Sequence, residues 1–437
     1  MFATRDDFST HDNFAKKCKF SANKKWKFAP RSSKFLISFL IASVVVCLIA
    51  CICVCVFQKE CFASDKKNSA SGELQNELEQ NVDDNLNILD FDSLDKWLAG
   101  LDGEYGGVAG NGFRAMINDI ISGNFKGDFN TFSNILLKSF AGALLDIMPM
   151  LLMLVAIAVL FSILNGLTSG FLSTQTKEII YFVCYSSMII MILVKTTQLI
   201  GLTKGVVGSM QSLMELAFPL LVTAITMLGG INTAAVFKPM MAVLSASIMS
   251  VISKFVMPLF IAIIIFCVVG NLSKEIRLEK ITNFFHSLAK TVLGAIFSIF
   301  VTFLSLQGLT GNILDSVSVK TAKFAMQSYV PILGGYLSDG FDLLMASVVL
   351  IKNSMGVAFI VIIVATILSP IIKIAVFSLG LKLVSGIVEP LCDERFSKMT
   401  SAVSKNLTLL IVIIIGVAFM FVVLLMLAIY ACNMGVV

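Results

Sequence analysis

The residues that could do chemistry in this chain are concentrated in one polar run near its last third. The run extends from Ser305 to Asn353 and separates two apolar stretches. Because an unsatisfied backbone group in hydrocarbon costs several kcal/mol, polar residues, glycines and a proline at this place must serve a packed interior, a pore or a partner. We single out as a candidate pore or partner segment Gln307, Gly308, Asp315, Lys320, Lys323, Pro331, Gly334, Gly335, Asp339, Lys352 and Asn353.

Within this run, residues 315–330 have the spacing of an amphipathic helix. One face carries Val319, Ala322, Met326 and Val330, and the other carries Lys320, Lys323 and Gln327. Such a helix can lie in the membrane interface while its lysines reach water. It can equally line a pore mouth or dock a partner. The residues alone leave both interpretations open.

The second half of the run combines backbone breakers with charge. Gly334 and Gly335 follow Pro331 and favour close backbone approach or a non-helical bend. With Asp339 nearby, this pattern indicates a broken helix or a re-entrant segment, which membranes tolerate only inside protein or beside water. Lys352-Asn353 directly precede the next apolar stretch. An interfacial anchor is the alternative to a functional role for that pair.

The sequence offers no catalytic, metal-binding or cofactor-binding constellation. Of its two histidines, His11 lies in the N-terminal segment and His286 has no Cys, Asp or Glu at ligand spacing on its helix. There is no P-loop, no GxSxG motif and no paired intramembrane carboxylate. The ten cysteines form no CxxC pair, and most lie in or beside apolar stretches, as small hydrophobes do. We therefore expect neither enzyme activity nor a cofactor.

The composition is that of an integral membrane protein. The 437 residues are 57% hydrophobic and 14% charged, whereas soluble domains carry about 25% charged residues. The sequence predicts an all-α polytopic fold with about 7–9 transmembrane helices. The apolar stretches lie at 143–164, 179–200, 213–228, 236–253, 255–272, 288–306, 355–372, 374–388 and 406–432.

Charge is segregated at the N-terminal end. Residues 1–34 hold nine Lys/Arg and three Asp, whereas residues 64–140 hold thirteen Asp/Glu and six Lys/Arg. A basic region followed by an apolar run at 35–57 predicts a signal segment over 1–63, with cleavage after Ala63. A retained anchor and lipoprotein processing at Cys51 are the alternatives. Each of them places residue 64 onward outside the cell, and the basic N-terminus is expected to be cytoplasmic rather than bound to nucleic acid.

Five further regions follow the signal segment. Residues 64–87 are predicted to be a polar linker with too few apolar residues to pack. Residues 88–142 carry three short amphipathic stripes separated by glycines, predicted to be external helices on the membrane surface or against a partner. A first transmembrane bundle is expected at 143–306, the polar segment at 307–354 and a C-terminal transmembrane bundle at 355–437.

Orientation follows from the basic loop around Lys274 and Arg277, which should be cytoplasmic. Counting spans from that loop places 64–140 and 307–354 together on the external side. The same count makes residues 229–233 a tight cytoplasmic turn. The stretch 374–388 is short and contains Lys382, so it either spans or is re-entrant, and the side of the C-terminus stays open.

The polar run also resembles a known family. The residues that carry the resemblance are Ser305-Leu306-Gln307-Gly308-Leu309-Thr310-Gly311, Asp315, Lys320-Thr321-Ala322-Lys323-Phe324, Pro331-Ile332-Leu333-Gly334-Gly335, Asp339 and Lys352-Asn353, with a second patch from Pro219-Leu220-Leu221 through Gly229-Gly230 to Lys238-Pro239. In this order they resemble the stage III sporulation protein AE family over most of 90–432. The long N-terminal extension, 1–34, departs from that pattern.

The resemblance implies a multi-pass protein of the mother-cell membrane surrounding the forespore. Its implied partners are the other proteins of the stage III sporulation A operon, including a cytoplasmic ATPase and ring-forming subunits, membrane lipids and, indirectly, a forespore channel protein. The implied function is a channel or export-gate core needed for late forespore gene expression and spore maturation. A non-conducting scaffold of that complex is one alternative. An autonomous secondary transporter is another, although such proteins usually show paired broken helices and this sequence has one interrupted region.

Overall fold

The computed structural model describes residues 71–100, 112–123, 129–168, 174–272, 278–307, 312–329 and 334–430. The chain divides into two compact units, Met1–Cys53 and Val54–Val437, and every described residue belongs to the second. The predicted signal segment 1–63 and its cleavage after Ala63 lie outside the described residues, as do Gly308 and Pro331 of the predicted site.

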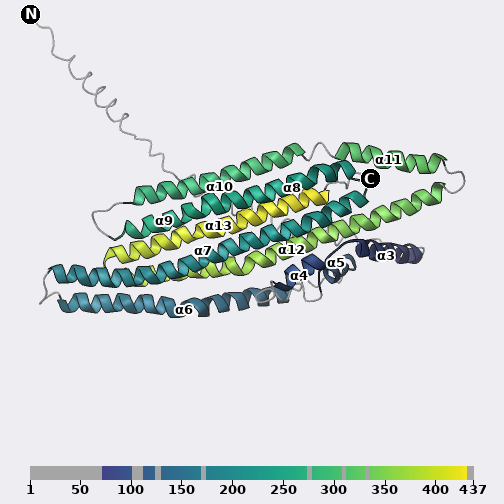
Figure 1. Ribbon diagram of the computed structural model, residues 1–437. Coiled ribbons are helices and arrows are strands. Elements are labelled where there is room, and N and C mark those ends of the chain that lie inside the picture. The colour runs from purple at the N-terminus through teal and green to yellow at the C-terminus, as the bar shows by residue number, and fades with distance from the viewer. Residues whose placement is uncertain are drawn as a thin grey trace, which may run out of the picture. The chain divides into compact units, whose positions relative to one another are not determined.

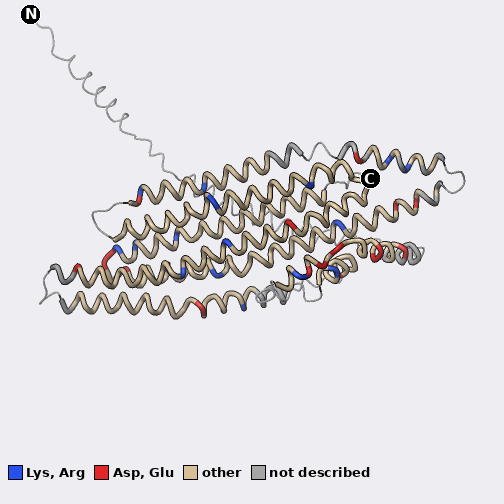
Figure 2. The backbone as a smooth tube through the Cα atoms, viewed as in Figure 1, with Lys and Arg blue, Asp and Glu red and all other residues tan. Residues whose placement is uncertain are grey.

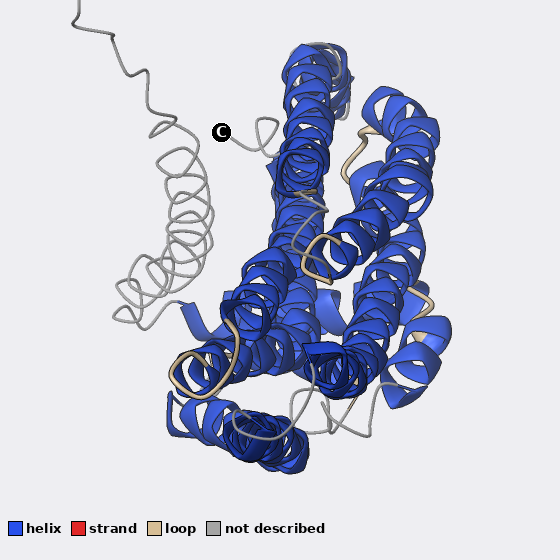
Figure 3. Ribbon diagram, turned by 90° about the vertical axis from the view of Figure 1, so that its left-hand side faces the viewer, coloured by secondary structure: helices blue, strands red, loops and turns tan. Residues whose placement is uncertain are grey.

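These ranges contain helices and turns but no strand, which confirms the all-α fold class (Figures 1 and 3). The helices are α3 (Ser71–Ile88), α4 (Asp92–Gly100), α5 (Phe113–Ile121), α6 (Phe129–Thr168), α7 (Thr174–Met227), α8 (Ile231–Val251), the π-helical turn η1 (Ile252–Val256), α9 (Met257–Val269), α10 (Glu279–Gln307), α11 (Asn312–Tyr329), α12 (Gly334–Val388) and α13 (Glu394–Tyr430).

Six described helical stretches are long and apolar enough to cross a membrane. They are Leu136–Gly166, Glu178–Met227, Ile231–Val269, Glu279–Thr302, Ser338–Val388 and Glu394–Tyr430. Three pairs of predicted spans therefore become three continuous stretches, so the described residues contain six candidate spans where the sequence predicts 7–9. Polar residues such as Lys204 and Glu215 divide the apolar pattern of α7, but they do not interrupt its backbone hydrogen bonding. The 55-residue α12 is about 80 Å long, more than twice the thickness of the hydrocarbon core.

The antiparallel pair α12 and α13 forms the centre of the bundle. Ser378 bonds Ser404 and Ser385 bonds Ser397, at 3.1 and 3.0 Å between hydroxyl oxygens. Because these pairs are two turns apart on both helices, they fix one register. Small residues let membrane helices approach closely, and a Cβ at Gly356 would clash with the side chain of Ile429. The α12–α13 seam is therefore closely packed.

Peripheral helices surround this centre and present apolar side chains outward. On α6, Leu145 is 73% exposed and Leu152 is 65% exposed, and on α10 Ile299 is 70% exposed. In water, such helices would lose the free energy of burying these side chains. In a bilayer, outward apolar side chains contact lipid tails, so α6 and α10 are the lipid-facing edges of a membrane bundle.

The short helices α3, α4 and α5 pack against the bundle itself. Residues from Ser71 on form α3, whose Asn85 Nδ2 donates to Ser347 Oγ of α12 at 2.9 Å. The prediction of a polar linker over 64–87 is wrong from Ser71 on, because Val82 and Leu86 suffice to bury one face. On α5, the Phe113 ring lies 4.8 Å from the Phe359 ring of α12. The third predicted stripe is the start of α6.

The two ends of the bundle hold different connections (Figure 1). At one end, which we call the Arg395 end, Tyr181, Asn271–Leu272 and Asp393–Arg395 meet. At the other, the Asp315 end, the 229–233 turn contacts Asp315 of α11. The prediction that 229–233 and 307–354 lie on opposite sides is therefore wrong. It failed because α7 was counted as two crossings.

Candidate functional site

The α7–α8 turn at the Asp315 end leaves backbone amides without a local partner. Gly229 ends α7 with a φ of 77°, a left-handed conformation that glycine adopts without strain. Gly230 then occupies the N-cap of α8 and has no side chain to cap it. The first amides of a helix lack intrahelical acceptors. A partner from elsewhere in the chain must therefore satisfy them.

Asp315 of α11 is that partner. One carboxylate oxygen accepts from the Thr233 amide at 2.8 Å. The other accepts from the amide and the side-chain amide of Asn232, at 3.2 and 3.0 Å. Asp315 is only 4% exposed, and a carboxylate at a helix N-terminus also complements the helix dipole. It caps α8 across 82 residues of sequence, which ties α11 to the bundle.

The charge of Asp315 is favoured by this arrangement. Burial alone would raise its pKa, but the hydrogen bonds from Thr233 and Asn232 outweigh burial and lower the pKa below the usual value for aspartate. Asp315 is therefore ionised at neutral pH. Its local role is to hold a helix terminus, and its three hydrogen bonds leave it little capacity to act as a proton donor or acceptor in a reaction.

An apolar cluster one turn further along the same face of α11 adds to this attachment. Leu228, Met345 and Val348 are buried together, and Val319 of α11 packs against them. A Cβ added at Gly229 would lie 3.0 Å from Val319 Cγ2. The glycine therefore serves two purposes, since it permits the left-handed turn and it lets α11 approach.

Polar contacts join α11 to the first turns of α12. Lys323 Nζ pairs with an Asp342 carboxylate oxygen, and Gln327 Nε2 donates to Ser338 Oγ at 2.9 Å. Lys320 is exposed. Val317 and Phe324, which are 61% and 67% exposed, share the outer surface with it. The predicted amphipathic helix exists, but its lysines have different surroundings.

The structure brings together some of the predicted site residues and separates others. Asp315, Lys320 and Lys323 lie on α11, while Gly334, Gly335 and Asp339 lie in the first turns of α12. The predicted break at Gly334-Gly335 is instead the start of a helix that continues without interruption to Val388. Gln307 is the last residue of α10.

Lys352 and Asn353 lie inside α12 rather than at its entrance. Lys352 is fully buried. The Asn353 Oδ1 atom is also buried, and the described residues offer it no hydrogen bond. An interfacial anchor would have an exposed amine, so that alternative is wrong for Lys352. A buried lysine within an apolar helix is costly, and membrane proteins place such residues where they serve ion or substrate pathways.

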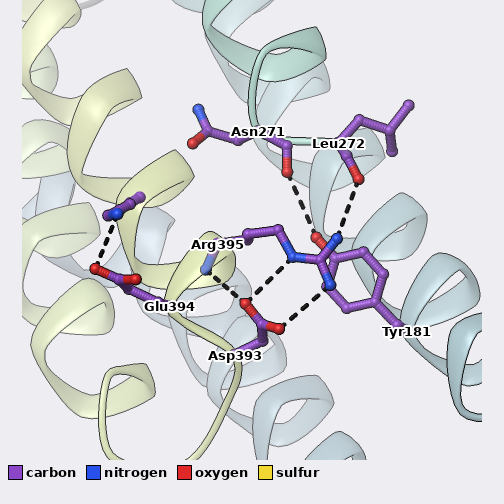
Figure 4. Close-up of polar contacts among 7 residues, drawn as sticks. Tyr181, Asn271, Leu272, Asp393, Glu394 and Arg395 are labelled. Atoms are coloured by element: carbon purple, nitrogen blue, oxygen red, sulfur yellow. Dashed lines mark hydrogen bonds and ion pairs between the residues drawn. The ribbon is translucent and has the colours of Figure 1, made fainter. Parts of the chain in front are cut away.

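Sequence reasoning missed a second polar junction, at the Arg395 end (Figure 4). The Arg395 guanidinium lies 3.7 Å from the centre of the Tyr181 ring. It donates to both carboxylate oxygens of Asp393, at 3.2 Å each. It also donates to the Leu272 carbonyl at 3.5 Å, and the Tyr181 hydroxyl donates to the Asn271 carbonyl at 3.5 Å. One side chain thus joins α7, the end of α9 and the start of α13.

A signal for this junction was present in the sequence. Asp393-Glu394-Arg395 is a compact charged triplet between two apolar stretches, and Arg is suited to pairing and ring stacking at once. The neighbouring Cys392 is a structural residue. Burial, with Cys184 and Asp393 nearby, raises its pKa to about 11, so its thiol stays protonated and donates to the Ala158 carbonyl.

Charged side chains are sparse along the bundle helices and denser on α3 to α5 (Figure 2). Within the described ranges, no group of three or more His, Cys, Asp or Glu side chains is arranged to hold a metal ion. The two junctions described above are built from packing, helix capping and charge pairing.

Comparison with known proteins agrees with these features. The family model of stage III sporulation protein AE matches residues 112–432. The chain belongs to that family. It is 23% identical over 333 residues to stage III sporulation protein AE of Bacillus subtilis strain 168, covering 76% of this chain and 84% of the relative. No solved structure matches the chain.

Family membership makes this a sporulation-related membrane protein, and its six apolar helices indicate a multi-pass one. The match covers the whole bundle from α5 to the end of α13, so both polar junctions lie in the region that defines the family. It begins after α3 and α4, which add to the bundle in this chain from outside the matched range.

Proposed function

We propose that this family member is the membrane-embedded core, a channel or export-gate subunit, of the sporulation complex that links mother cell and forespore. The observation that carries the proposal is Lys352, a lysine with no exposed surface inside the apolar helix α12. Removing a cation from water costs several kcal/mol. A protein that only anchors others has no need to maintain such a residue in its core.

The surroundings of Lys352 support a polar interior. Ser347 and Ser354 on the same helix are buried, and Asn353 follows directly with a buried oxygen. Polar groups within the bundle can replace the water molecules that hydrate an ion or a polar substrate. A gate would close by packing these groups between helices and open by separating them.

The two ends of the bundle suit different partners. The acidic helices α3 to α5 and the exposed surface of α11 would face the intermembrane space, where ring-forming subunits assemble. The Arg395 end would face the mother-cell cytoplasm and the ATPase. Late forespore gene expression would then depend on transport through the assembled complex, and spore maturation would depend on both.

A non-conducting scaffold is the second candidate, and the α12–α13 seam favours it. Two serine pairs and the Gly356–Ile429 approach hold the central helices in close contact along their length. Close small-residue packing of this kind stabilises membrane bundles without any transport role.

Replacing Lys352 by Met separates the candidates. In a sporulating host whose own gene is deleted, Lys352→Met should abolish a late forespore-specific transcription reporter while the complex still co-purifies. The methionine fills a similar volume and removes the charge, so the helix packing should persist. Lys382→Met is the matched control, because Lys382 lies on the same helix and is exposed. A normal reporter signal with Lys352→Met would favour the scaffold.

A further inference from the structure

Three basic side chains meet where α10 packs on α13. His286 and Lys290 are one turn apart on α10, so they share a face. Lys405 of α13 lies at the same level, because Lys290 and Lys405 each follow the start of their helix by 11 residues, and the two helices meet further along where the Phe297 and Phe419 rings lie 5.3 Å apart. The two lysines are close enough to repel each other. None of the three makes a hydrogen bond or an ion pair with any residue that the structure describes. Like charges placed together without a counter-charge destabilise a fold.

Nearby acidic residues do not neutralise this basic cluster, which comprises His286, Lys290 and Lys405. At the same end of the bundle, Asp393 is held by Arg395, and Glu394 pairs with Lys398 at 2.8 Å. Glu279 is the first residue of α10 and lies two turns before His286. Among the residues that the structure describes, this end of the bundle therefore has a local excess of positive charge.

The cluster lies where the charged part of each helix gives way to an apolar part. Lys290 and Lys405 are the last charged residues of their helices, and each is followed by an uncharged, mainly apolar stretch to the helix end. The two helices run in the same direction from the Arg395 end (Figure 1). Lys or Arg side chains that close a polar stretch before an apolar one typically lie at the membrane–water interface.

One exposed apolar side chain of α10 lies in line with the cluster. Val301 is three turns beyond Lys290 on the same face and is 39% exposed, whereas the more exposed Phe284 and Ile299 lie on the far side of the helix. Phe285 stacks on Phe266 of α9 with ring centres 5.3 Å apart, which steadies this part of α10. The cluster therefore borders an apolar, partly exposed surface of α10, an arrangement that matches a headgroup attached to an acyl chain.

We propose that His286, Lys290 and Lys405 bind the phosphate of an anionic phospholipid at the membrane interface, with an acyl chain lying beside Val301 of α10. A phosphate supplies the missing counter-charge and accepts hydrogen bonds from all three side chains. Basic patches between membrane helices on the cytoplasmic side are suited to anionic headgroups. The lipid would hold α10 against α13 and relieve the mutual repulsion of the lysines.

The test uses the full-length protein in nanodiscs of phosphatidylcholine alone or of phosphatidylcholine with phosphatidylglycerol. Native mass spectrometry counts the anionic lipid retained, and thermal unfolding reports its effect on stability. Each lysine near an anionic surface contributes roughly fivefold in affinity, so Lys290→Gln with Lys405→Gln should lower retention about 25-fold. The Arg variants at both positions should retain the lipid.

The control is the pair Lys382→Gln with Lys398→Gln, which removes the same charge from exposed positions outside the cluster. An equal loss with the control pair would overturn the proposal, because general surface charge would then explain the binding. In phosphatidylcholine alone, the cluster variant should be at least as stable as the wild type, since repulsion is removed. If the double variant fails to fold, the exposed Lys405→Gln alone gives the same comparison with about a fivefold loss.

A further arm distinguishes lipid from free anion. Inorganic phosphate added to the protein in phosphatidylcholine nanodiscs should neither raise the unfolding temperature nor compete with phosphatidylglycerol. Stabilisation by inorganic phosphate that depends on Lys290 and Lys405 would show a soluble-anion site and overturn the lipid assignment. Equal retention of zwitterionic and anionic lipid would also overturn it.

Discussion

At each end of the bundle, one charged side chain joins separate helices: a cation at the Arg395 end and an anion at the Asp315 end. At the Arg395 end, a cation pairs with a carboxylate, stacks on Tyr181 and reaches the Leu272 carbonyl just past the end of α9. At the Asp315 end, an anion accepts the first amides of α8. Asp315 complements the helix terminus that it meets, because a helix N-terminus carries a partial positive charge, whereas the charge of Arg395 is balanced by Asp393.

The difference lies in what each junction holds. Arg395 joins α7, α9 and α13, all of which belong to membrane-spanning stretches, so its loss would loosen the bundle as a whole. Asp315 joins α8 to α11, which is not among the spanning stretches. The Arg395 end thus closes the bundle, whereas the Asp315 end attaches a helix that lies outside the spanning stretches.

The largest effect is expected at Arg395. Arg395→Gln removes the pairing to Asp393 and the contact with Tyr181, and leaves a partly buried carboxylate without its partner. We expect the free energy of unfolding to fall by about 2–4 kcal/mol, a value reduced because both side chains keep some exposure. Thermal unfolding of the purified protein measures it.

Arg395→Lys sharpens this comparison. It keeps the charge but loses the planar fork, so it should recover less than half of the lost stability. Full recovery with Lys would show that the stacking on Tyr181 contributes nothing. Glu394→Gln, which removes a neighbouring exposed carboxylate paired with Lys398, should change stability by less than about 0.5 kcal/mol.

A smaller and more local effect is expected at Asp315. Asp315→Ala leaves the first amides of α8 without acceptors, which should cost about 1–2 kcal/mol. Because the contact joins only α8 and α11, hydrogen exchange should quicken in peptides from Asn312–Tyr329 while α12 and α13 stay protected. Uniform loss of protection across the bundle would contradict the division between the two ends.

Asp315 also predicts a pH dependence. Its pKa is lowered in the folded protein, so the ionised form contributes stability that is present above the unfolded pKa of about 3.9. That contribution is lost as the pH falls through the lower, folded pKa. Hydrogen exchange of α11 should therefore stay slow at neutral pH and quicken in strongly acidic buffer. Asp315→Asn should flatten this dependence.

Gly229 allows an intermediate test of the Asp315 end. Gly229→Ala places a Cβ on a residue with a φ of 77° and brings it 3.0 Å from Val319 Cγ2. The left-handed conformation alone costs about 1–2 kcal/mol for a residue other than glycine. Gly123→Ala is the matched control, because its φ is 70° but no atom lies within 4 Å of the new Cβ. A greater loss at Gly229, measured by thermal unfolding, would give the cost of the Val319 contact.

Much of this arrangement could be predicted from the sequence. Apolar length identified every membrane stretch, and the spacing at 315–330 identified α11. Two things could not be read in this way. Hydropathy divided α7, α12 and the α8–α9 stretch at polar residues, because it does not register backbone continuity. The partners of Asp315 and Arg395 lie 82 and 123 residues away, and a single sequence does not show which distant segments meet.

The surroundings of Lys352 also could not be predicted from the sequence, because they depend on where its helix begins. A lysine just before an apolar stretch looks like an interfacial anchor when the helix is assumed to start after it. Once α12 is seen to start at Gly334, the same lysine is more than four turns inside the helix and fully buried. The residue type was informative, but the helix boundary decided its meaning.

The smallest effect is expected at the exposed ion pair between α11 and α12. Lys323 and Asp342 keep 36% and 51% of their side-chain surface, so losing the pair through Lys323→Asp should cost no more than about 1 kcal/mol. Exchanging the charges, Lys323→Asp with Asp342→Lys, should restore the stability while it inverts the local charge pattern. Lys320→Glu should leave stability unchanged, since Lys320 is exposed and is not a member of this ion pair. If sporulation fails with the exchanged pair and with Lys320→Glu although α11 remains protected from hydrogen exchange, the surface of α11 recognises a partner. Normal sporulation with both variants would limit α11 to closing the Asp315 end.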